Sequence, residues 1–415
     1  MTTDSEKYIL IIGNYSSANR GDAAIMDGLI KILARDFPDH KLKISSYFPE
    51  VAEHFHHLPS VGPIIKTKWR PLSTRMAEII KIAILLLLPL PVFHFITRDK
   101  SATNIYKNAA FIVMVGGGNL HAPYFNELWG RMSELVYCAC VGKKLYIIGQ
   151  SLGPFGSGLL KHYCQYALNK CTHIFPREEI SRQRLIENEV TTPLTVIPDV
   201  AFAIEATDFS NDGATFLRNE GIDLENKRKV ITVSVRKWLG DKRKNEQFQS
   251  SLALVLDKLV ENDFCIVFIA TCTSYGNYHN DDRETAFSVW RRMTNRRHAH
   301  ILINEYSPYE IGAILKTAWF HIGMRLHSCI LAFDVGTPCI AIEYESKTTG
   351  VMKQMGLSDY VLHFNNLDPD KLLLLADRLQ EDYEHVKNTV ISSTKDQRDL
   401  LNKRISVSLN NTTSN

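Results

Sequence analysis

The sequence lacks the features that mark several classes of protein. Its eight cysteines include no Cys-x-x-Cys pair, and none stands with histidine at zinc-finger spacing, so a zinc module is excluded. No apolar run reaches the roughly 18–20 residues that span a bilayer, which excludes a transmembrane protein. Lysine and arginine number 48 and aspartate and glutamate 45, a balance too even to indicate a nucleic-acid binder.

The polar start MTTDSEKY carries no secretory signal. In so large a chain the cysteines do not indicate a disulfide scaffold, and we expect them to be reduced and mostly buried. We therefore expect a cytoplasmic protein. Hydrophobic residues make up 45% of the 415 residues, which is ample for two sizeable cores.

Apolar runs of strand length alternate with stretches of helical periodicity along the chain. The expected strands span 8–14, 42–48, 110–118, 144–154, 172–178 and 194–202 in the first half, and 230–236, 265–272, 298–304, 319–325 and 338–344 in the second. Alternating β and α units predict parallel sheets with helices on both faces. The fold class is therefore α/β, with two Rossmann-like doubly wound domains facing across a cleft.

A polar stretch from Glu205 to Lys229 marks the expected domain boundary. We predict an N-terminal domain over 1–205 with an insertion at 60–100, a C-terminal domain over 225–385, and a C-terminal helix with a disordered tail over 386–415. Segment 66–98 of the insertion is basic first and then apolar. It is either a core helix or an amphipathic flap that contacts a membrane face or a lipid-linked substrate.

Three glycine-containing loops follow expected strands of the first half. GNYSSANRGDAAI (13–25) leads into a helix: Gly21 lets the backbone approach a ligand, and Asp22 is either the helix cap or a reactive group. VGGGN (115–119) predicts a close backbone approach to a ligand or to the opposite domain, and His121 after it is a candidate acceptor-site group. In GQSLGPF (149–155), Gln150 and Ser151 can hydrogen-bond sugar hydroxyls, and the alternative is turn chemistry at Gly-Pro.

Fixed positive charge marks other strand ends. Arg177 in PREEIS can bind carboxylate or phosphate bidentately, and Asp199 in PDVAF is its expected ion-pair partner. Arg325 and His327 in GMRLHSCILAF stand at a strand-to-helix junction, where the helix N-terminus adds to a site for a phosphorylated anion. Lys347 can reach the same anion.

One polar strand end is open to a metal interpretation. TCTSYGNYHNDDRE (271–284) contains Asp281 and Asp282, which we expect to cap the following helix rather than to bind a metal. We therefore expect no metal site.

Taken in order, GNYSSANRGDAAI, VGGGN, GQSLGPF, PREEIS, PDVAF and RLHS resemble the polysaccharide pyruvyl transferase family over about residues 8–360. TCTSYGNYHNDDRE and YESKTTGVMKQMGL narrow the resemblance to the branch of colanic-acid and amylovoran pyruvyl transferases. The resemblance implies two Rossmann-like domains in a GT-B-like arrangement, with the acceptor on the N-terminal side and phosphoenolpyruvate on the C-terminal side. It also implies transfer of pyruvate from phosphoenolpyruvate to sugar hydroxyls of a bacterial exopolysaccharide repeat unit, often as a ketal, with no cofactor.

The resemblance implies catalytic roles for Asp22, Arg177 and His327, and donor binding by Arg325 and Leu326. The family often has Arg-Asp where this chain has Arg177-Glu178, and the arginine is retained. The remaining candidates for substrate binding are Lys347, Gly21, Asn14, Gly117, Asn119, His121 and Gln150.

The implied chemistry suits these residue types. Phosphoenolpyruvate carries a phosphate and a carboxylate, which Arg325, Arg177 and Lys347 can bind. Protonation of its methylene carbon makes C2 electrophilic, a sugar hydroxyl attacks, phosphate leaves, and a second hydroxyl closes the ketal. We expect His327 to bind the phosphate and act as the acid and Asp22 to orient or deprotonate the acceptor hydroxyl, and the two roles can be exchanged.

Two other interpretations stay open. A nucleotide-sugar glycosyltransferase on the same GT-B fold would use Arg325 and Lys347 for a diphosphate and Glu345 for a ribose. A non-catalytic polysaccharide-assembly protein would keep the fold and release no phosphate.

The expected partners are phosphoenolpyruvate and a sugar acceptor, with no nucleic acid. Segment 66–98 motivates a lipid-linked acceptor and a peripheral position at the inner face of the membrane.

Overall fold

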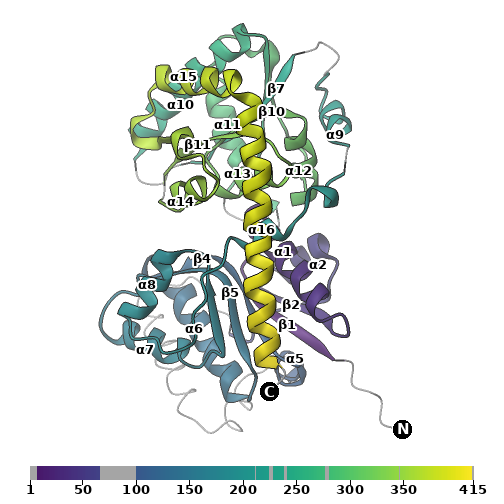
Figure 1. The fold of residues 1–415 in the computed structure, drawn as a ribbon, viewed down its shortest axis with the longest axis vertical. Coiled ribbons are helices and arrows are strands. Elements are labelled where there is room, and N and C mark those ends of the chain that lie inside the picture. The colour runs from purple at the N-terminus through teal and green to yellow at the C-terminus, as the bar shows by residue number, and fades with distance from the viewer. Residues whose placement is uncertain are drawn as a thin grey trace. The chain divides into compact units, whose positions relative to one another are not determined.

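The computed structural model describes residues 7–65, 100–210, 212–223, 228–237, 241–275, 280–344 and 346–413. It divides into two compact α/β units (Figure 1). Unit 1 contains Met1–Ser17, Ile25–Ala203 and Leu400–Asn415, and unit 2 contains Ala18–Ala24 and Ile204–Asp399. Segment 66–98, interpreted above as a core helix or a membrane-contacting flap, lies outside the described residues.

The sheet of unit 1 is parallel, with the strand order β3-β2-β1-β4-β5-β6. Its strands are β1 (Tyr8–Asn14), β2 (Lys41–Ser46), β3 (Ser60–Val61), β4 (Ile112–Leu120), β5 (Leu145–Leu152) and β6 (His173–Pro176). Most are continuous apolar runs, as expected where helices cover both faces of a parallel sheet. The order reverses between β1 and β4, which is the point where ligands bind in folds of this type.

Helices α1 (Arg20–Asp36), α2 (Pro49–His56), α5 (Lys100–Asn108), α6 (Phe125–Cys140), α7 (Gly158–Leu168) and α8 (Glu179–Glu187) connect these strands. The core between sheet and helices is fully buried, with Leu10, Ile112 and Ile147 on strands packed near Leu128 and Leu135 on α6. The beginning of α1 is exceptional, because residues 18–24 belong to unit 2.

The sheet of unit 2 is also parallel, with the order β12-β11-β10-β7-β8-β9. Its strands are β7 (Lys229–Ser234), β8 (Phe264–Phe268), β9 (Ala299–Ile301), β10 (Ala318–Gly323), β11 (Cys339–Glu343) and β12 (Val361–His363). Its helices are α9 (Gly213–Asn219), α10 (Lys242–Glu261), α11 (Asp282–Trp290), α12 (Pro308–Lys316), α13 (Leu326–Asp334), α14 (Ser346–Gln354), α15 (Pro369–Glu381) and the first part of α16 (Tyr383–Thr413).

Both sheets have the same connectivity. When the strands of each unit are counted from its own first strand, both orders become 3-2-1-4-5-6, the Rossmann arrangement. The expected α/β class with two doubly wound units is therefore confirmed. That the two units face each other across a cleft stays a prediction.

Two expected features differ from the structure. Residues 194–202 were expected to form a strand, and they pair with β6 at a single bridge between Ile174 and Leu194 before a 3₁₀ turn at Val200–Ala203. Pro198 has no backbone N–H to continue the ladder. The tail was expected to be disordered over its last residues, but α16 continues to Thr413. Among the described helices, none is long and apolar enough to cross a membrane.

Candidate active site

The carboxyl ends of four strands gather charged side chains in unit 2. Arg325 follows β10 and is the N-cap of α13, and Asp282 is the first residue of α11, which follows β8. Arg236 comes two residues after β7, and Tyr344 directly follows β11. Parallel strands bring these positions to one edge of the sheet.

A bidentate ion pair fixes Arg325. Its Nη2 lies 2.5 Å from Oδ1 of Asp282, and its Nε lies 3.1 Å from Oδ2. Burial lowers the pKa of Arg325, but the Asp282 carboxylate together with Cys272 and Tyr344 outweighs burial, so the pKa lies well above its usual value. Nη1 makes neither of these contacts, so the guanidinium keeps donors for an anionic ligand.

The expectation that both aspartates cap a helix is confirmed for one of them. Asp281 is the N-cap of α11, and its side chain accepts a hydrogen bond from the backbone N–H of Arg283. Asp282 instead pairs with Arg325 and accepts from the backbone N–H of Cys272. Within the described ranges, no group of three or more His, Cys, Asp or Glu side chains is placed to hold a metal ion.

A buried histidine supports the turn that carries Arg325. His321 Nδ1 lies 3.1 Å from the carbonyl oxygen of Thr232 and 3.0 Å from the hydroxyl oxygen of the same residue. Ser328 Oγ donates to the Arg325 carbonyl oxygen at 2.7 Å, and it lies 2.9 Å from His321 Nε2 and 2.6 Å from Ser234 Oγ. Burial lowers the pKa of His321 to about 3, so the ring stays neutral.

Residues 18–24, which comprise the end of the loop after β1 and the first turn of α1, reach this edge as part of unit 2, and we call them the Asp22 loop. Asn19 forms a bridge with Cys272, and the backbone N–H of Arg20 donates to the Thr271 carbonyl oxygen at 2.7 Å. A Cβ on Gly21 would lie 2.3 Å from His327 Nδ1, so the backbone of Gly21 packs directly on that ring. The structure thus brings Gly21, the neighbour of Asp22, against His327, and the acid–base roles of Asp22 and His327 stay a prediction.

The pKa of the buried Cys272 thiol responds to several charged side chains at this edge of the sheet. Burial raises the pKa of Cys272 to about 12. Arg325 and Arg236 oppose this shift, whereas the Asp282 and Asp22 carboxylates add to it. All four charged groups therefore act on the same position at the carboxyl edge of the unit 2 sheet.

Arg236 is a candidate that the sequence interpretation missed. Its Nη1 donates to the Tyr344 hydroxyl at 2.7 Å, and its guanidinium lies 4.5 Å from the centre of that ring. The signal was present, because VITVSVR ends in an arginine just beyond a buried strand. Lys347, half-buried on the first turn of α14, follows the neighbouring strand β11. Glu345 lies outside the described residues.

The other candidates belong to unit 1. Arg177 is buried and pairs with Asp199 at 2.8 Å, which confirms the expected ion pair, and its Nε donates to Ser151 Oγ at 2.7 Å. Gln150 stands opposite Gly117 in the β4–β5 register. Arg177 is thus placed in a different unit from Asp22, Arg325 and His327, and its catalytic role stays a prediction.

Three more candidates lie at the carboxyl ends of β1 and β4. The Asn14 side-chain oxygen accepts from Ser46 Oγ at 3.0 Å, which holds it between β1 and β2. His121 lies edge-on to Tyr124, with ring centres 4.7 Å apart. Asn119 is on β4, and its side chain is outside the described part of the structure.

The glycine run in β4 has a structural reason that the sequence interpretation did not include. A Cβ on Gly116 would lie 2.3 Å from the Gly149 carbonyl oxygen on β5. The close backbone approach expected at VGGGN is therefore, at Gly116, an approach to the neighbouring strand.

A Ser–His–Asp arrangement in unit 1 was also missed. Ser17 Oγ lies 2.7 Å from His56 Nε2, and His56 Nδ1 lies 2.6 Å from Asp27 Oδ1. All three residues are buried. We therefore interpret the arrangement as an anchor for the end of the loop after β1 rather than as a catalytic triad.

Comparison with known proteins places the chain among enzymes of polysaccharide synthesis. The family model described as polysaccharide pyruvyl transferase matches residues 19–346. Amylovoran biosynthesis protein AmsJ of Erwinia amylovora is 28% identical, over 95% of this chain and 97% of that protein.

Solved structures of low identity share the fold. HepE of Anabaena in complex with UDP-glucose is 12% identical with a TM-score of 0.58, covering 98% of both chains. UDP-GlcNAc 2-epimerase of Neisseria meningitidis bound to UDP-GlcNAc is 12% identical with a TM-score of 0.57, covering 97% of this chain and 99% of that one. The family model spans most of the sequence, including Asp22, Arg177, Arg325 and His327, and the chain belongs to the polysaccharide pyruvyl transferase family.

Proposed function

We propose that this protein transfers pyruvate from phosphoenolpyruvate to two hydroxyls of a sugar in a bacterial exopolysaccharide repeat unit, forming a ketal and releasing phosphate. Family membership supports pyruvyl transfer in polysaccharide synthesis. The observation that supports phosphoenolpyruvate as the donor is the group of cationic side chains at the carboxyl edge of the unit 2 sheet. There Arg325, held by Asp282, lies at the start of α13, beside His327.

The negative charge of phosphoenolpyruvate matches the positive charge of these side chains. Phosphoenolpyruvate has a phosphate and a carboxylate, and binding both requires several cations. In the proposal, Arg325 and the N-terminus of α13 bind the phosphate, and Arg236 and Lys347 add positive charge from the neighbouring strand ends. Leu326, the first residue of α13, contributes its backbone N–H to the same anion site. Arg177, which belongs to unit 1, keeps the catalytic role that the family resemblance implies, as a prediction.

The reaction balances without a cofactor. A proton adds to the methylene carbon, which becomes the methyl group, and the oxygen of one acceptor hydroxyl bonds to C2. The bond from C2 to the phosphate oxygen breaks, the second hydroxyl bonds to C2, and the two hydroxyl protons end on the methyl group and on phosphate. His327 supplies the proton and Asp22 receives one from an acceptor hydroxyl, or the two exchange these roles.

Donor binding is tested by a thermal-shift titration with phosphoenolpyruvate, in parallel with UDP-glucose. A ligand that binds the folded state raises the melting temperature. We expect phosphoenolpyruvate to raise it in the wild type and in Arg378→Ala, an exposed control arginine paired with Asp359, and not in Arg325→Ala. A response to UDP-glucose alone would favour the glycosyltransferase interpretation, for which the UDP-sugar complexes of similar fold are the supporting observation.

Turnover is tested by phosphate release from phosphoenolpyruvate, with amylovoran freed of pyruvate by mild acid as the acceptor probe. The 28% identity to AmsJ, an amylovoran biosynthesis protein, motivates this probe. Loss of an acid–base group should slow turnover about 10²–10⁴-fold. Normal turnover in His327→Ala would exclude the role given to that residue.

A further inference from the structure

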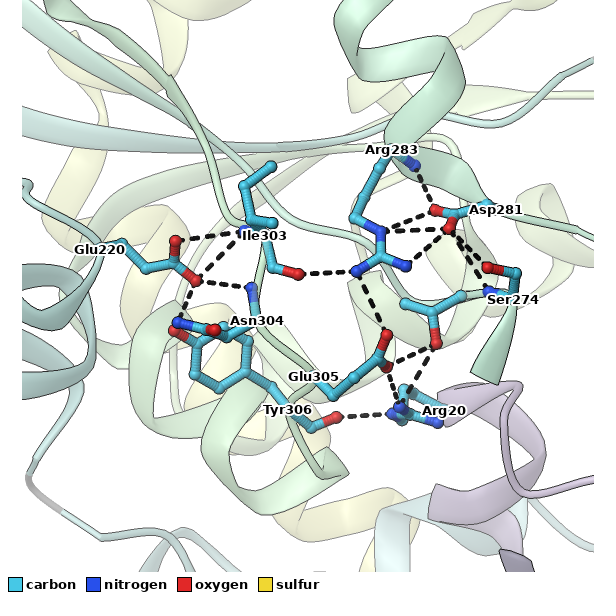
Figure 2. A network of polar contacts seen from close by, with 10 residues as sticks. Arg20, Glu220, Ser274, Asp281, Arg283, Ile303, Asn304, Glu305 and Tyr306 are labelled. Atoms are coloured by element: carbon cyan, nitrogen blue, oxygen red, sulfur yellow. Dashed lines mark hydrogen bonds and ion pairs between the residues drawn. The ribbon is translucent and has the colours of Figure 1, made fainter. Parts of the chain in front are cut away.

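Arg20 is a buried cation two residues before Asp22. Its side chain is 1% exposed, and it points into unit 2 toward Glu305 (Figure 2). Its Nη2 lies 2.6 Å from Glu305 Oε2, and its Nε donates to the Tyr306 carbonyl oxygen at 2.5 Å. A buried cation is costly unless it is paired and hydrogen-bonded, and Arg20 meets both conditions.

Glu305 is shared between two arginines. Its Oε2 accepts from Arg20 and from Thr273 Oγ1 at 2.6 Å, while its Oε1 lies 3.1 Å from Arg283 Nη1. Arg283 is fixed in turn by Asp281 at 2.6 Å (Figure 2). The partner of Arg20 is therefore oriented from the N-terminus of α11 and does not depend on Arg20 for its position.

The backbone around Arg20 also contacts residues of unit 2. The Arg20 N–H donates to the Thr271 carbonyl oxygen, and Gly21 packs against the His327 ring. Asp22 is the next residue, and the Asn19 side chain donates to its Oδ2 at 3.0 Å. Anchoring Arg20 thus fixes the position of Asp22 relative to His327.

Arg20 is not arranged to touch substrate. Its guanidinium is buried and directed at Glu305, Thr273 and the Tyr306 carbonyl oxygen. The Arg325–Asp282 pair does not include it. Removal of Arg20 should therefore impair the position of Asp22 far more than it impairs donor binding.

We propose that Arg20 is a positioning residue, which through Glu305 holds the Asp22 loop against His327, so that acceptor activation depends on an ion pair remote from the substrate. The proposal deepens the proposed function and rests on it for the role of Asp22. The position of the loop itself can be measured without turnover.

The test compares Arg20→Met, Asp22→Asn and the double variant with Arg378→Met as the control for loss of an arginine. Misplacing a catalytic group by about 1 Å can cost about 10²-fold in rate. We expect Arg20→Met to lower kcat about 10-fold to 100-fold, with KM for phosphoenolpyruvate within about 3-fold of wild type. Because Arg20 acts through Asp22, the double variant should match Asp22→Asn within about 3-fold.

A merely structural role for Arg20 would give multiplied losses in the double variant, and that result would overturn the proposal. Amide hydrogen exchange of peptides covering 18–24 is the second measurement. We expect faster exchange there in Arg20→Met, with 323–330 unchanged. Unaltered exchange at 18–24 would also overturn the proposal.

Glu305→Gln keeps the side-chain shape and serves if Arg20→Met does not fold. It should show the same pattern of kcat loss and loop exchange, with a smaller amplitude. If wild type releases no phosphate from phosphoenolpyruvate, the proposed function fails, and the exchange measurement still decides whether Arg20 holds the loop.

Discussion

At the scale of single residues, His321 connects the turn that carries Arg325 to the sheet. Its folded pKa of about 3 lies below the ordinary 6.5. The unfolded chain therefore binds a proton below pH 6.5 that the folded chain does not bind until about pH 3. The free energy of unfolding should fall with decreasing pH in that window by about 1.4 kcal/mol per unit, reaching a loss of about 2 kcal/mol at pH 5.

The variant His321→Gln isolates this contribution, because glutamine keeps hydrogen-bonding capacity without titrating. Urea unfolding between pH 7 and pH 4 should show the wild type losing stability more steeply than the variant. Above pH 6.5 the two curves should run parallel, since His321 is neutral in both states there. Parallel curves throughout the range would show that His321 is protonated in the folded protein.

Individual residues were easier to predict than their partners. Arg325, His327 and Asp22 were selected because their residue types follow strand ends. The Arg177–Asp199 pair was predicted because both residues follow apolar runs of the same domain. Asp282 was assigned to a helix cap, because a sequence does not show that α11 begins next to α13.

At the scale of elements, the start of α1 depends on a glycine. Gly21→Ala would place a Cβ 2.3 Å from His327 Nδ1, so either the loop or the ring must move. We expect kcat for phosphate release to fall at least about 10-fold, because Asp22 and His327 lose their relative position.

Gly350 on α14 provides the matched control, because a Cβ there meets no atom within 4 Å. Gly350→Ala should leave kcat unchanged and stabilise the protein by up to about 1 kcal/mol through helix propensity. Full turnover in Gly21→Ala would show that the contact between Gly21 and His327 is not needed for the reaction.

The elements themselves were largely predictable, because strands of a parallel sheet are apolar on both faces and glycines follow several of them. The exception, 194–202, shows the limit of that signal. The backbone N–H groups of Thr195 and Ile197 do bond to carbonyl oxygens of β6. Apolar character thus predicted the location beside the sheet, while Pro198 prevented a full strand.

At the scale of the whole molecule, the chain does not divide at a single boundary. The expected domains 1–205 and 225–385 follow the sequence order, but residues 18–24 are part of unit 2 and residues 400–415 part of unit 1. The hydrophobic periodicity of the sequence reports local structure, so it does not show in which of the two cores a segment is buried. Contacts distant in sequence decide this, such as Arg20 with Glu305 and Arg404 with the Val196 carbonyl oxygen.

The end of α16 should therefore contribute stability to unit 1 alone. Ile405 is fully buried there, whereas Val407 on the same helix is 57% exposed. Ile405→Ala should lower the free energy of unfolding of unit 1 by about 3 kcal/mol through lost burial and a cavity, and Val407→Ala should change it by less than about 0.5 kcal/mol. Hydrogen exchange resolved by peptide checks this: Ile405→Ala should accelerate exchange in the strands β1, β4 and β5 and leave β7, β8 and β10 unchanged. Equal acceleration in both sheets would mean that the two units unfold together, and α16 would then stabilise the molecule as a whole.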